Sequence, residues 1–331
     1  MARPGGNKPR LIDRRPLKAL LAIALAGFAA WAVFAAWNAV RTAGAGALHA
    51  LWLLPGLMAL HLVQLLVSSK AWHSIVPQGP GLSSLYRLRI IREGIDSLLP
   101  VAQVGGEVVG AQLLSQRGPA LPEAAASVVV DVTIEFLSQL AFLLAGIAAL
   151  AMVSHTLAWQ GWLGAALITA GLAASLLLVQ RYGMLRLLEA LARQIAARWP
   201  GVGSLAGLDA AASAIYARRG RLAVCAGLHW LSWMLGSLES WAVLHALGFA
   251  VTPAEAFVVE ALGMAARSAG FAIPGALVIQ ETGFALAAAS VGLPEAAGLS
   301  LSLLKRAREV STGLLGLALW WLEQRRPAHQ G

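Results

Sequence analysis

The sequence predicts an all-α protein that crosses a membrane several times. Three observations support this fold class: 58% of the residues are hydrophobic and only 12% are charged, the apolar residues gather in runs of membrane-spanning length, and one Pro- and Gly-interrupted element occurs twice. Water-soluble domains carry about 25% charged residues. We therefore expect a polytopic membrane protein of six to eight transmembrane helices, in which two Pro/Gly-broken re-entrant elements belong to an inverted repeat.

Apolar runs place the predicted helices, because a helix needs roughly 20 apolar residues to cross a bilayer. Long runs lie near 17–40, 48–67, 123–153, 161–180 and 222–247, and shorter pieces lie near 255–272, 274–291 and 295–323. The first run is longer than the hydrophobic core of a cleavable signal peptide, which has about 7–15 residues. We therefore interpret it as a retained span.

The basic residues predict the orientation of the chain. There are 25 Lys and Arg against 16 Asp and Glu, and they concentrate in the N-terminal arm, in 68–118, in 181–221 and in the tail. Cytoplasmic loops carry such an excess. We expect a membrane protein with both termini in the cytoplasm and contacts to anionic phospholipid, rather than a nucleic-acid partner.

The domain organisation follows from the same pattern. We expect one integral membrane domain over 1–331, with one repeat half at about 48–153 and the other at about 222–323. The linker includes 181–221, where Leu and Ile at helical spacing alternate with Arg. Such a basic amphipathic stretch suits the inner leaflet. A loop helix whose apolar face packs against the bundle fits the pattern equally well.

An internal repeat is visible in two pairs of matching segments. The chain reads PVAQVGGE at 100–107 and PGALVIQE at 274–281, so that a Glu follows a Pro by seven residues in both. The pentapeptide LPEAA follows at 121–125 and again at 293–297. Because both pairs occur in the same order at nearly the same separation, we infer an internal duplication.

The two copies are predicted to run in opposite directions. The helix at 123–153 leaves a cytoplasmic loop, whereas the helix at 295–323 ends at Arg325 and Arg326. Inverted repeats are common in transporters, whose substrate site lies where discontinuous segments of the two halves meet. The broken segments must line protein or a wet cavity, because lipid cannot satisfy their free backbone groups.

Charged residues inside the apolar runs are the candidate site. Each costs at least about 2.5–3.5 kcal/mol at the centre of a membrane helix, so it needs a partner or a function. Asp131 and Glu135 lie one helical turn apart on one face. The candidate substrate path comprises Arg92, Pro100, Gly106, Glu107, Asp131, Glu135, Arg267, Pro274, Gly275, Glu281 and Arg306.

Two interpretations of these charges remain open. In the first, they form an ion-pair network between the halves, with Asp131 and Glu135 of one repeat helix against Lys305 and its basic neighbours on the other. In the second, they line a polar cavity for a lipid headgroup, in which Arg side chains clamp an anion.

Catalytic and metal motifs are missing from the sequence. The seven His have no metal-ligand spacing, and there is no nucleophile or phosphate-loop motif. Cys225 lies in an apolar stretch, which is typical of a buried small hydrophobe. We therefore expect no cofactor, no metal and no catalytic residues, and favour a lipid transporter over an enzyme.

The run REGIDSLLPVAQVGGE at 92–107, together with IPG at 273–275 and Glu281, carries a family resemblance. It resembles the transmembrane region of lysylphosphatidylglycerol synthases, the flippase-like integral membrane family, over roughly 15–325. Within that family the chain is most similar to the hopanoid biosynthesis-associated membrane proteins. The residues at the family's motif positions are Pro100, Glu107, Pro274 and Glu281.

The resemblance implies lipid translocation or trafficking across the inner membrane, with hopanoids or hopanoid-bearing lipids as the cargo. Many relatives have more Gly before the second Glu, where this chain has Val-Ile-Gln, and the bulkier turn suits an apolar cargo. One rival is an integral-membrane lipid-modifying transferase. Another is a non-transporting scaffold that recruits hopanoid biosynthesis enzymes through the 181–221 loop.

Overall fold

The structure, a computed structural model, describes residues 50–76, 79–98, 105–153, 206–269 and 279–325. Within these ranges the chain forms helices and no strand, which confirms the predicted all-α class. The elements are the 3₁₀ turn η1 (Ala50–Leu53) and the helices α3 (Leu54–Ile75), α4 (Leu82–Leu98), α5 (Gly105–Ser115), α6 (Leu121–Val153), α9 (Leu208–Tyr216), α10 (Arg219–Ala246), α11 (Pro253–Ala269), α12 (Ile279–Ser290) and α13 (Glu295–Gln324).

The long helices lie where the apolar runs predict them, with α6 over the run at 123–153, α10 over 222–247 and α13 over 295–323. Two described segments, Ala50–Ile75 and Leu121–Val153, are long and apolar enough to cross a bilayer. The predicted spans at 17–40 and 161–180 lie outside the described residues. So do the basic N-terminal arm and residues 181–205 of the amphipathic loop.

The chain passes twice through the same order of helix lengths. Helices α4 and α11 have 17 residues each, the short helices α5 and α12 have 11 and 12, and the long helices α6 and α13 have 33 and 30. The turns before the two long helices each contain a glycine with positive φ, Gly118 and Gly292. A positive φ favours glycine, so a glycine allows the turn before each of the two long helices.

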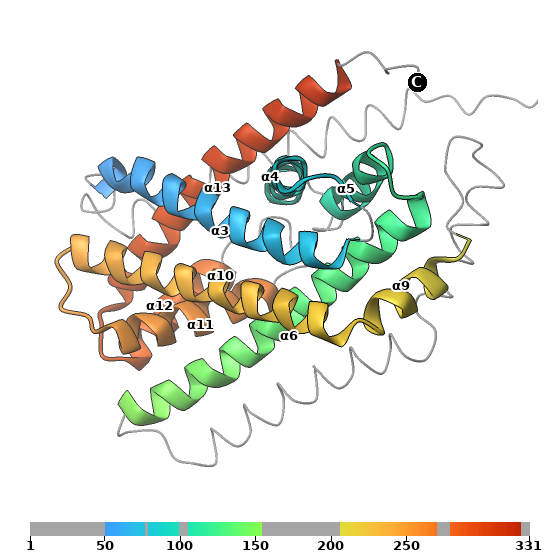
Figure 1. Cartoon of the computed structure of the whole chain (residues 1–331). Coiled ribbons are helices and arrows are strands. Elements are labelled where there is room, and N and C mark those ends of the chain that lie inside the picture. The colour runs from blue at the N-terminus through green and yellow to red at the C-terminus, as the bar shows by residue number, and fades with distance from the viewer. Residues whose placement is uncertain (1–49, 77–78, 99–104, 154–205, 270–278, 326–331) are drawn as a thin grey trace, which may run out of the picture.

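Contacts between helices follow the same twofold pattern. Helix α3 packs along α10, and each long helix packs on a 17-residue helix of the other half, α13 on α4 and α6 on α11. Within each half the short helix packs against its preceding partner, α5 on α4 and α12 on α11. Figure 1 shows that α3 and α10 run in opposite directions, as do α6 and α13.

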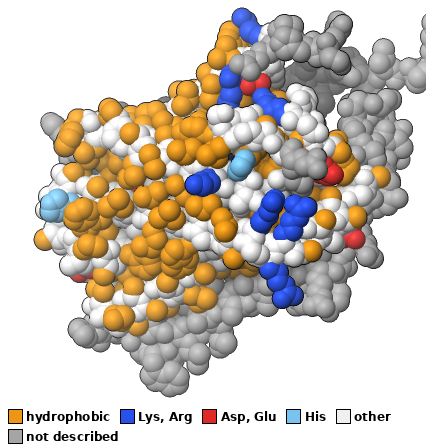
Figure 2. Space-filling view, viewed as in Figure 1, with side chains coloured by type: hydrophobic (Ala, Val, Ile, Leu, Met, Phe, Trp, Pro, Cys, Tyr) orange, Lys and Arg blue, Asp and Glu red, His pale blue; other side chains and the backbone are white. Residues whose placement is uncertain are grey.

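Helix α10 has an apolar exposed face and polar buried residues, which is the reverse of a helix in a water-soluble protein. Val224, Leu231 and Leu238, spaced by seven residues, are 54%, 47% and 47% exposed, while His229 and Glu239 are fully buried. Figure 2 shows hydrophobic side chains over much of the visible described surface, with Lys and Arg gathered toward one side. An apolar exterior around a polar interior suits a lipid environment.

Two buried apolar clusters lie toward the two ends of α3. One contains Trp72 and Ile75, together with residues of α4, α5 and α6. The other contains Leu57, together with residues of α11, α12 and α13. The stretch of α3 between them, from His61 to Ser68, carries polar side chains that face inward. The apolar packing therefore leaves a polar layer between the two clusters.

Small residues let α13 and α4 touch through their backbones. A Cβ atom added at Gly94 would lie 2.7 Å from the carbonyl oxygen of Gly313, and one added at Gly316 would lie 2.8 Å from Cα of Gly94. The corresponding crossing of α6 and α11 uses Gly146 against Ala261. Close helix crossings through small residues are typical of membrane interfaces.

This crossing yields a test of the fold. Gly316→Ala should lower the free energy of unfolding by about 1–3 kcal/mol, because the new methyl group meets the backbone of α4 and not a side chain that could move. The measurement is the thermal unfolding midpoint of the purified protein in detergent. Gly227→Ala is the control, since an added Cβ there has no neighbour within 4 Å. Equal midpoints for both variants would contradict the packing.

Candidate functional site

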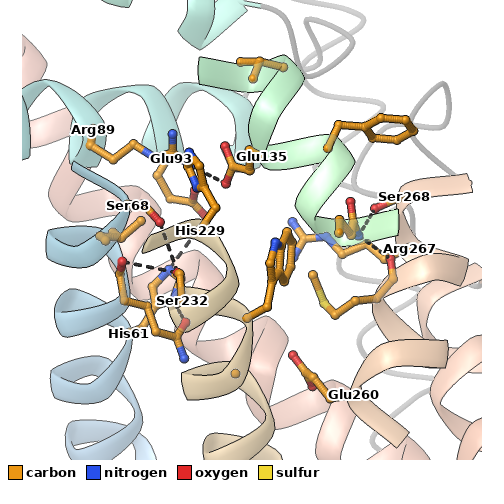
Figure 3. A pocket seen from close by; sticks show the side chains of 18 of the residues that line it. His61, Ser68, Arg89, Glu93, Glu135, His229, Ser232, Glu260, Arg267 and Ser268 are labelled. Atoms are coloured by element: carbon orange, nitrogen blue, oxygen red, sulfur yellow. Dashed lines mark hydrogen bonds and ion pairs between the residues drawn. The ribbon is translucent and has the colours of Figure 1, made fainter. Parts of the chain in front are cut away.

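A cavity of about 320 Å³ lies in the polar layer between the two halves, lined by residues of α3, α4, α5, α6, α10, α11 and α13. Two matching helical faces form one wall. Helix α3 contributes His61, Gln64, Leu65 and Ser68, and α10 contributes His229, Ser232, Trp233 and Gly236. This spacing puts each set on one side of its helix. Figure 3 shows side chains from both halves converging on this space.

Asp131 on α6 is the centre of a buried ion-pair network. Its side chain is fully buried, and its carboxylate accepts hydrogen bonds from Arg89 at 3.1 Å and Arg92 at 3.4 Å. Nε2 of His229 lies 3.0 Å from the other carboxylate oxygen. A carboxylate removed from water is tolerated only when such partners replace its hydration. The network thus ties α6 to α4 and to α10.

The same two arginines extend the network toward the cavity. Arg89 donates to Glu135 at 2.5 Å, and Glu135 lines the cavity one turn along α6 from Asp131. Arg92 forms an ion pair with Glu107 near the start of the short helix α5. Arg92 therefore links three helices of the first half.

A second network surrounds Lys305 and Arg308 of α13. Nζ of Lys305 lies 2.9 Å from Glu260 of α11 and 3.9 Å from Glu239 of α10. Arg308 also pairs with Glu239, which accepts a further hydrogen bond from Gln64 of α3 at 3.2 Å. Ser240 donates to Glu260 at 2.5 Å. This network joins α13 to the helices on the other side of the cavity.

The remaining charges of α13 connect to the second short helix and to α11. Arg306 lies 3.4 Å from Glu281 on α12 and 3.6 Å from Glu309 on its own helix. Arg267 of α11 pairs with Glu309 as well. Glu281 on α12 and Glu107 on α5 thus each pair with an Arg, but Arg306 comes from the long helix α13 and Arg92 from the 17-residue helix α4.

The predicted pairing between the two long helices is wrong. Asp131 and Glu135 contact arginines of α4 and the histidine of α10, whereas Lys305 contacts acids of α10 and α11. The reason is geometric: each long helix packs closely on the 17-residue helix of the other half, whereas its charged side chains reach α10 and the 17-residue helix of its own half. Between the halves, the described ion pairs include Asp131 on α6 with His229 on α10, and Arg87 on α4 with Glu323 on α13.

The predicted site residues fall into four groups. Glu107, Glu135 and Arg267 line the cavity. Arg92 and Asp131 lie directly behind its wall, and the backbone N–H of Gly106 donates to Asp96 at 2.8 Å where α5 meets α4. Glu281 and Arg306 pair with each other at the second short helix and are not part of the cavity wall. Pro100, Pro274 and Gly275 lie outside the described residues.

Sequence reasoning missed His61, Gln64, Glu93 and His229 as cavity residues. The signal available was the pair of similar strings HLVQLLVS at 61–68 and HWLSWMLG at 229–236, each with a His followed by polar or small residues on one helical face. A single His in an apolar helix is ordinarily a buried core residue. Only the packing of α3 along α10 brings the two strings to one cavity.

Three residues of types that can ligate a metal ion also lie close together, although their spacing in the sequence does not indicate a metal site. Among the described residues, Asp131, Cys225 and His229 each place one ligand-type atom within 4.8 Å of the others. Chain spacing could not reveal them, because Asp131 lies on a different helix. Arg89 and Arg92 contact the same carboxylate, and their positive charges oppose a divalent cation beside it. We therefore assign Asp131 and His229 to the ion-pair network and Cys225 to the buried apolar cluster.

Comparison with known proteins gives the chain its family. The family model described as the lysylphosphatidylglycerol synthase TM region matches residues 17–316, a range that includes every described cavity residue and ends within α13. No match was found among curated proteins or among solved structures. With the apolar exterior of its helices, the match makes this a membrane protein of a lipid-related family. The chain belongs to the lysylphosphatidylglycerol synthase transmembrane-region family.

Proposed function

We propose that this protein translocates an amphipathic lipid, of the hopanoid or hopanoid-bearing class, across the bacterial inner membrane. The observation that carries the proposal is the polar cavity enclosed between two halves of a helical protein whose outer surface is apolar. A headgroup needs a polar path through the membrane, whereas the apolar part of the lipid can remain in the bilayer. The proposed path consists of the candidate residues named from the sequence together with the residues that line the cavity.

The architecture that we propose for transport is an inverted repeat of six to eight transmembrane helices with both termini in the cytoplasm. In it, α4 with α5 and α11 with α12 are the two broken, re-entrant elements. The repeated order of helix lengths and the opposite directions of α6 and α13 support this topology. Alternating access then exposes the cavity to one leaflet at a time, as in other inverted-repeat transporters.

The short helices are the moving elements of this mechanism. Each carries a Glu in its first turn that pairs with an Arg, Glu107 with Arg92 and Glu281 with Arg306. We propose that these two ion pairs hold the two sides of the path closed in turn. Pro100, Pro274 and Gly275 are assigned to the connecting turns of the same elements.

Neutralising either Glu tests the assignment. Glu107→Gln and Glu281→Gln should each slow lipid translocation by about tenfold or more, because each variant loses a charge-assisted hydrogen bond worth roughly 1.5–3 kcal/mol. The measurement is the dithionite-accessible fraction of an acyl-labelled fluorescent lipid in proteoliposomes, followed over time.

The matched controls are Glu123→Gln and Glu295→Gln, which alter exposed acids near the starts of α6 and α13. They should translocate lipid at the wild-type rate. Wild-type rates in both the Glu107 and Glu281 variants, with normal insertion into the vesicles, would remove these residues from the path.

Lipid analysis in a hopanoid-producing bacterium separates transport from its rivals. We expect loss of the protein to change the hopanoid distribution between inner and outer membrane while the total stays constant. A missing chemical species would instead favour the lipid-modifying transferase. An unchanged distribution with unchanged species would contradict translocation and leave the scaffold as the better account.

A further inference from the structure

We propose that the cavity selects a hydroxyl-rich headgroup without net negative charge, and that His61 and Glu93 receive the hydrogen bonds that this headgroup donates. The inference rests on the proposed function in taking a lipid headgroup as the cavity's occupant. It replaces the anion clamp expected from the sequence, because the arginines of the wall are already neutralised.

The arginines that line the cavity are Arg89, Arg267 and Arg308. Arg89 pairs with Asp131 and Glu135, Arg267 pairs with Glu309, and Arg308 pairs with Glu239. An anion entering the cavity would have to displace one of these carboxylates, which would then lie in the membrane interior without its base. Breaking such a buried pair is strongly unfavourable. The wall therefore offers little attraction to a phosphate.

The carboxylates of the wall carry the surplus charge. They are Glu93, Glu107, Glu135 and Glu260. Three of them have a Lys or Arg partner, namely Glu107, Glu135 and Glu260. The structure gives Glu93 an ion-pair contact with His61, and with no Lys or Arg among the described residues. Its carboxylate is thus the point of the wall best able to accept hydrogen bonds from a ligand.

His61 lies opposite Glu93 and presents a second hydrogen-bond acceptor. The amide of Gln64 donates from its nitrogen to Glu239 at 3.2 Å, so its oxygen accepts from Nδ1 of His61 at 3.0 Å. With the proton on Nδ1, the neutral ring presents a lone pair at Nε2. Nε2 is buried, has no hydrogen-bond partner in the described structure, and lies 3.7 Å from Oε1 of Glu93.

Two acceptors that face each other at 3.7 Å lie too far apart for a hydrogen bond between them, so each is open to a donor from a ligand. Two neighbouring hydroxyls of a polyol or sugar supply one O–H to each acceptor, and the N–H groups of an amine supply the same donors. A phosphate group offers mainly acceptor oxygens and negative charge, so it satisfies these two acceptors poorly and is repelled by the charge of Glu93.

The rest of the wall favours hydroxyls, since they also accept hydrogen bonds. Nε1 of Trp233 is a buried donor without a partner in the described structure, and its ring lines the same cavity. Ser68 and Ser232 contribute hydroxyls from the two matching faces of α3 and α10. Mixed donors and acceptors beside an aromatic ring suit a polyol better than a bare cation.

The test is competition binding to the purified full-length protein in nanodiscs. Radiolabelled glucosyl diacylglycerol is the probe, and the competitors are unlabelled lipids with the same acyl chains and different headgroups: glucosyl, phosphoethanolamine and phosphate. We expect the glucosyl lipid to bind at least about tenfold more tightly than phosphatidic acid, with phosphatidylethanolamine between them. Tighter binding of phosphatidic acid, or no ranking, would overturn the inference; phosphatidylethanolamine in first place would replace the hydroxyl donor by an amine.

Glu93→Gln sharpens the test. Its carboxamide N–H can donate to Nε2 of His61, which satisfies that acceptor within the protein, so the variant should fold at least as stably as wild type. Its affinity for glucosyl diacylglycerol should nevertheless fall about tenfold, while its affinity for phosphatidic acid stays the same or rises. Glu295→Gln, at an exposed acid, should leave all affinities unchanged.

A wild-type affinity for the glucosyl lipid in Glu93→Gln would overturn the role of Glu93. If the variant fails to fold, the lipid ranking of the wild type decides alone. The outcome is separable from that of the proposed function, because binding is measured without transport. If the protein binds the lipids in the predicted order but moves none of them, only the proposed translocation is contradicted. If it transports lipid but prefers anionic headgroups, only the headgroup assignment is contradicted.

Discussion

Burial of carboxylates in a lipid-facing protein is the constraint on which the rest of this structure depends. Asp131, Glu239 and Glu260 are almost entirely removed from solvent, and the exposed apolar side chains of the helices cannot replace their hydration. Each must meet a base on another helix, so the ion pairs decide which helices are neighbours and at what height they cross. Glycines separately let α4 and α13 cross in backbone contact.

The same constraint shapes the cavity. Where the charged residues of the wall pair with one another, the wall is polar but offers a ligand no unpaired charge. Selectivity for a ligand then depends on the polar groups outside these ion pairs. Those groups are imidazole, indole and hydroxyl side chains from α3 and α10, together with one carboxylate of α4. The site is therefore built from residues that look unremarkable beside the charged ones in the sequence.

Much of the scaffold could be predicted from the sequence, because its signals are local. The Pro-Glu starts and apolar runs place α6 and α13 within a few residues of their observed ends. The spacing of Glu107 and Glu281 anticipates two short helices in equivalent places. The partners of Asp131 and Lys305 could not be predicted, since they depend on which helices pack together. The histidines were missed for the same reason: neither one is informative until α3 lies along α10.

Each of the two arginines that hold the short helices has a second acid on a long helix. Arg92 contacts Glu107 on α5 and Asp131 on α6, and Arg306 contacts Glu281 on α12 and Glu309 on α13. A short helix that moves away therefore leaves no bare guanidinium behind in the apolar interior. The Glu that departs has a side chain that is already partly exposed, 24% for Glu107 and 13% for Glu281. Partner exchange in place of outright charge separation keeps the barrier to such a movement low.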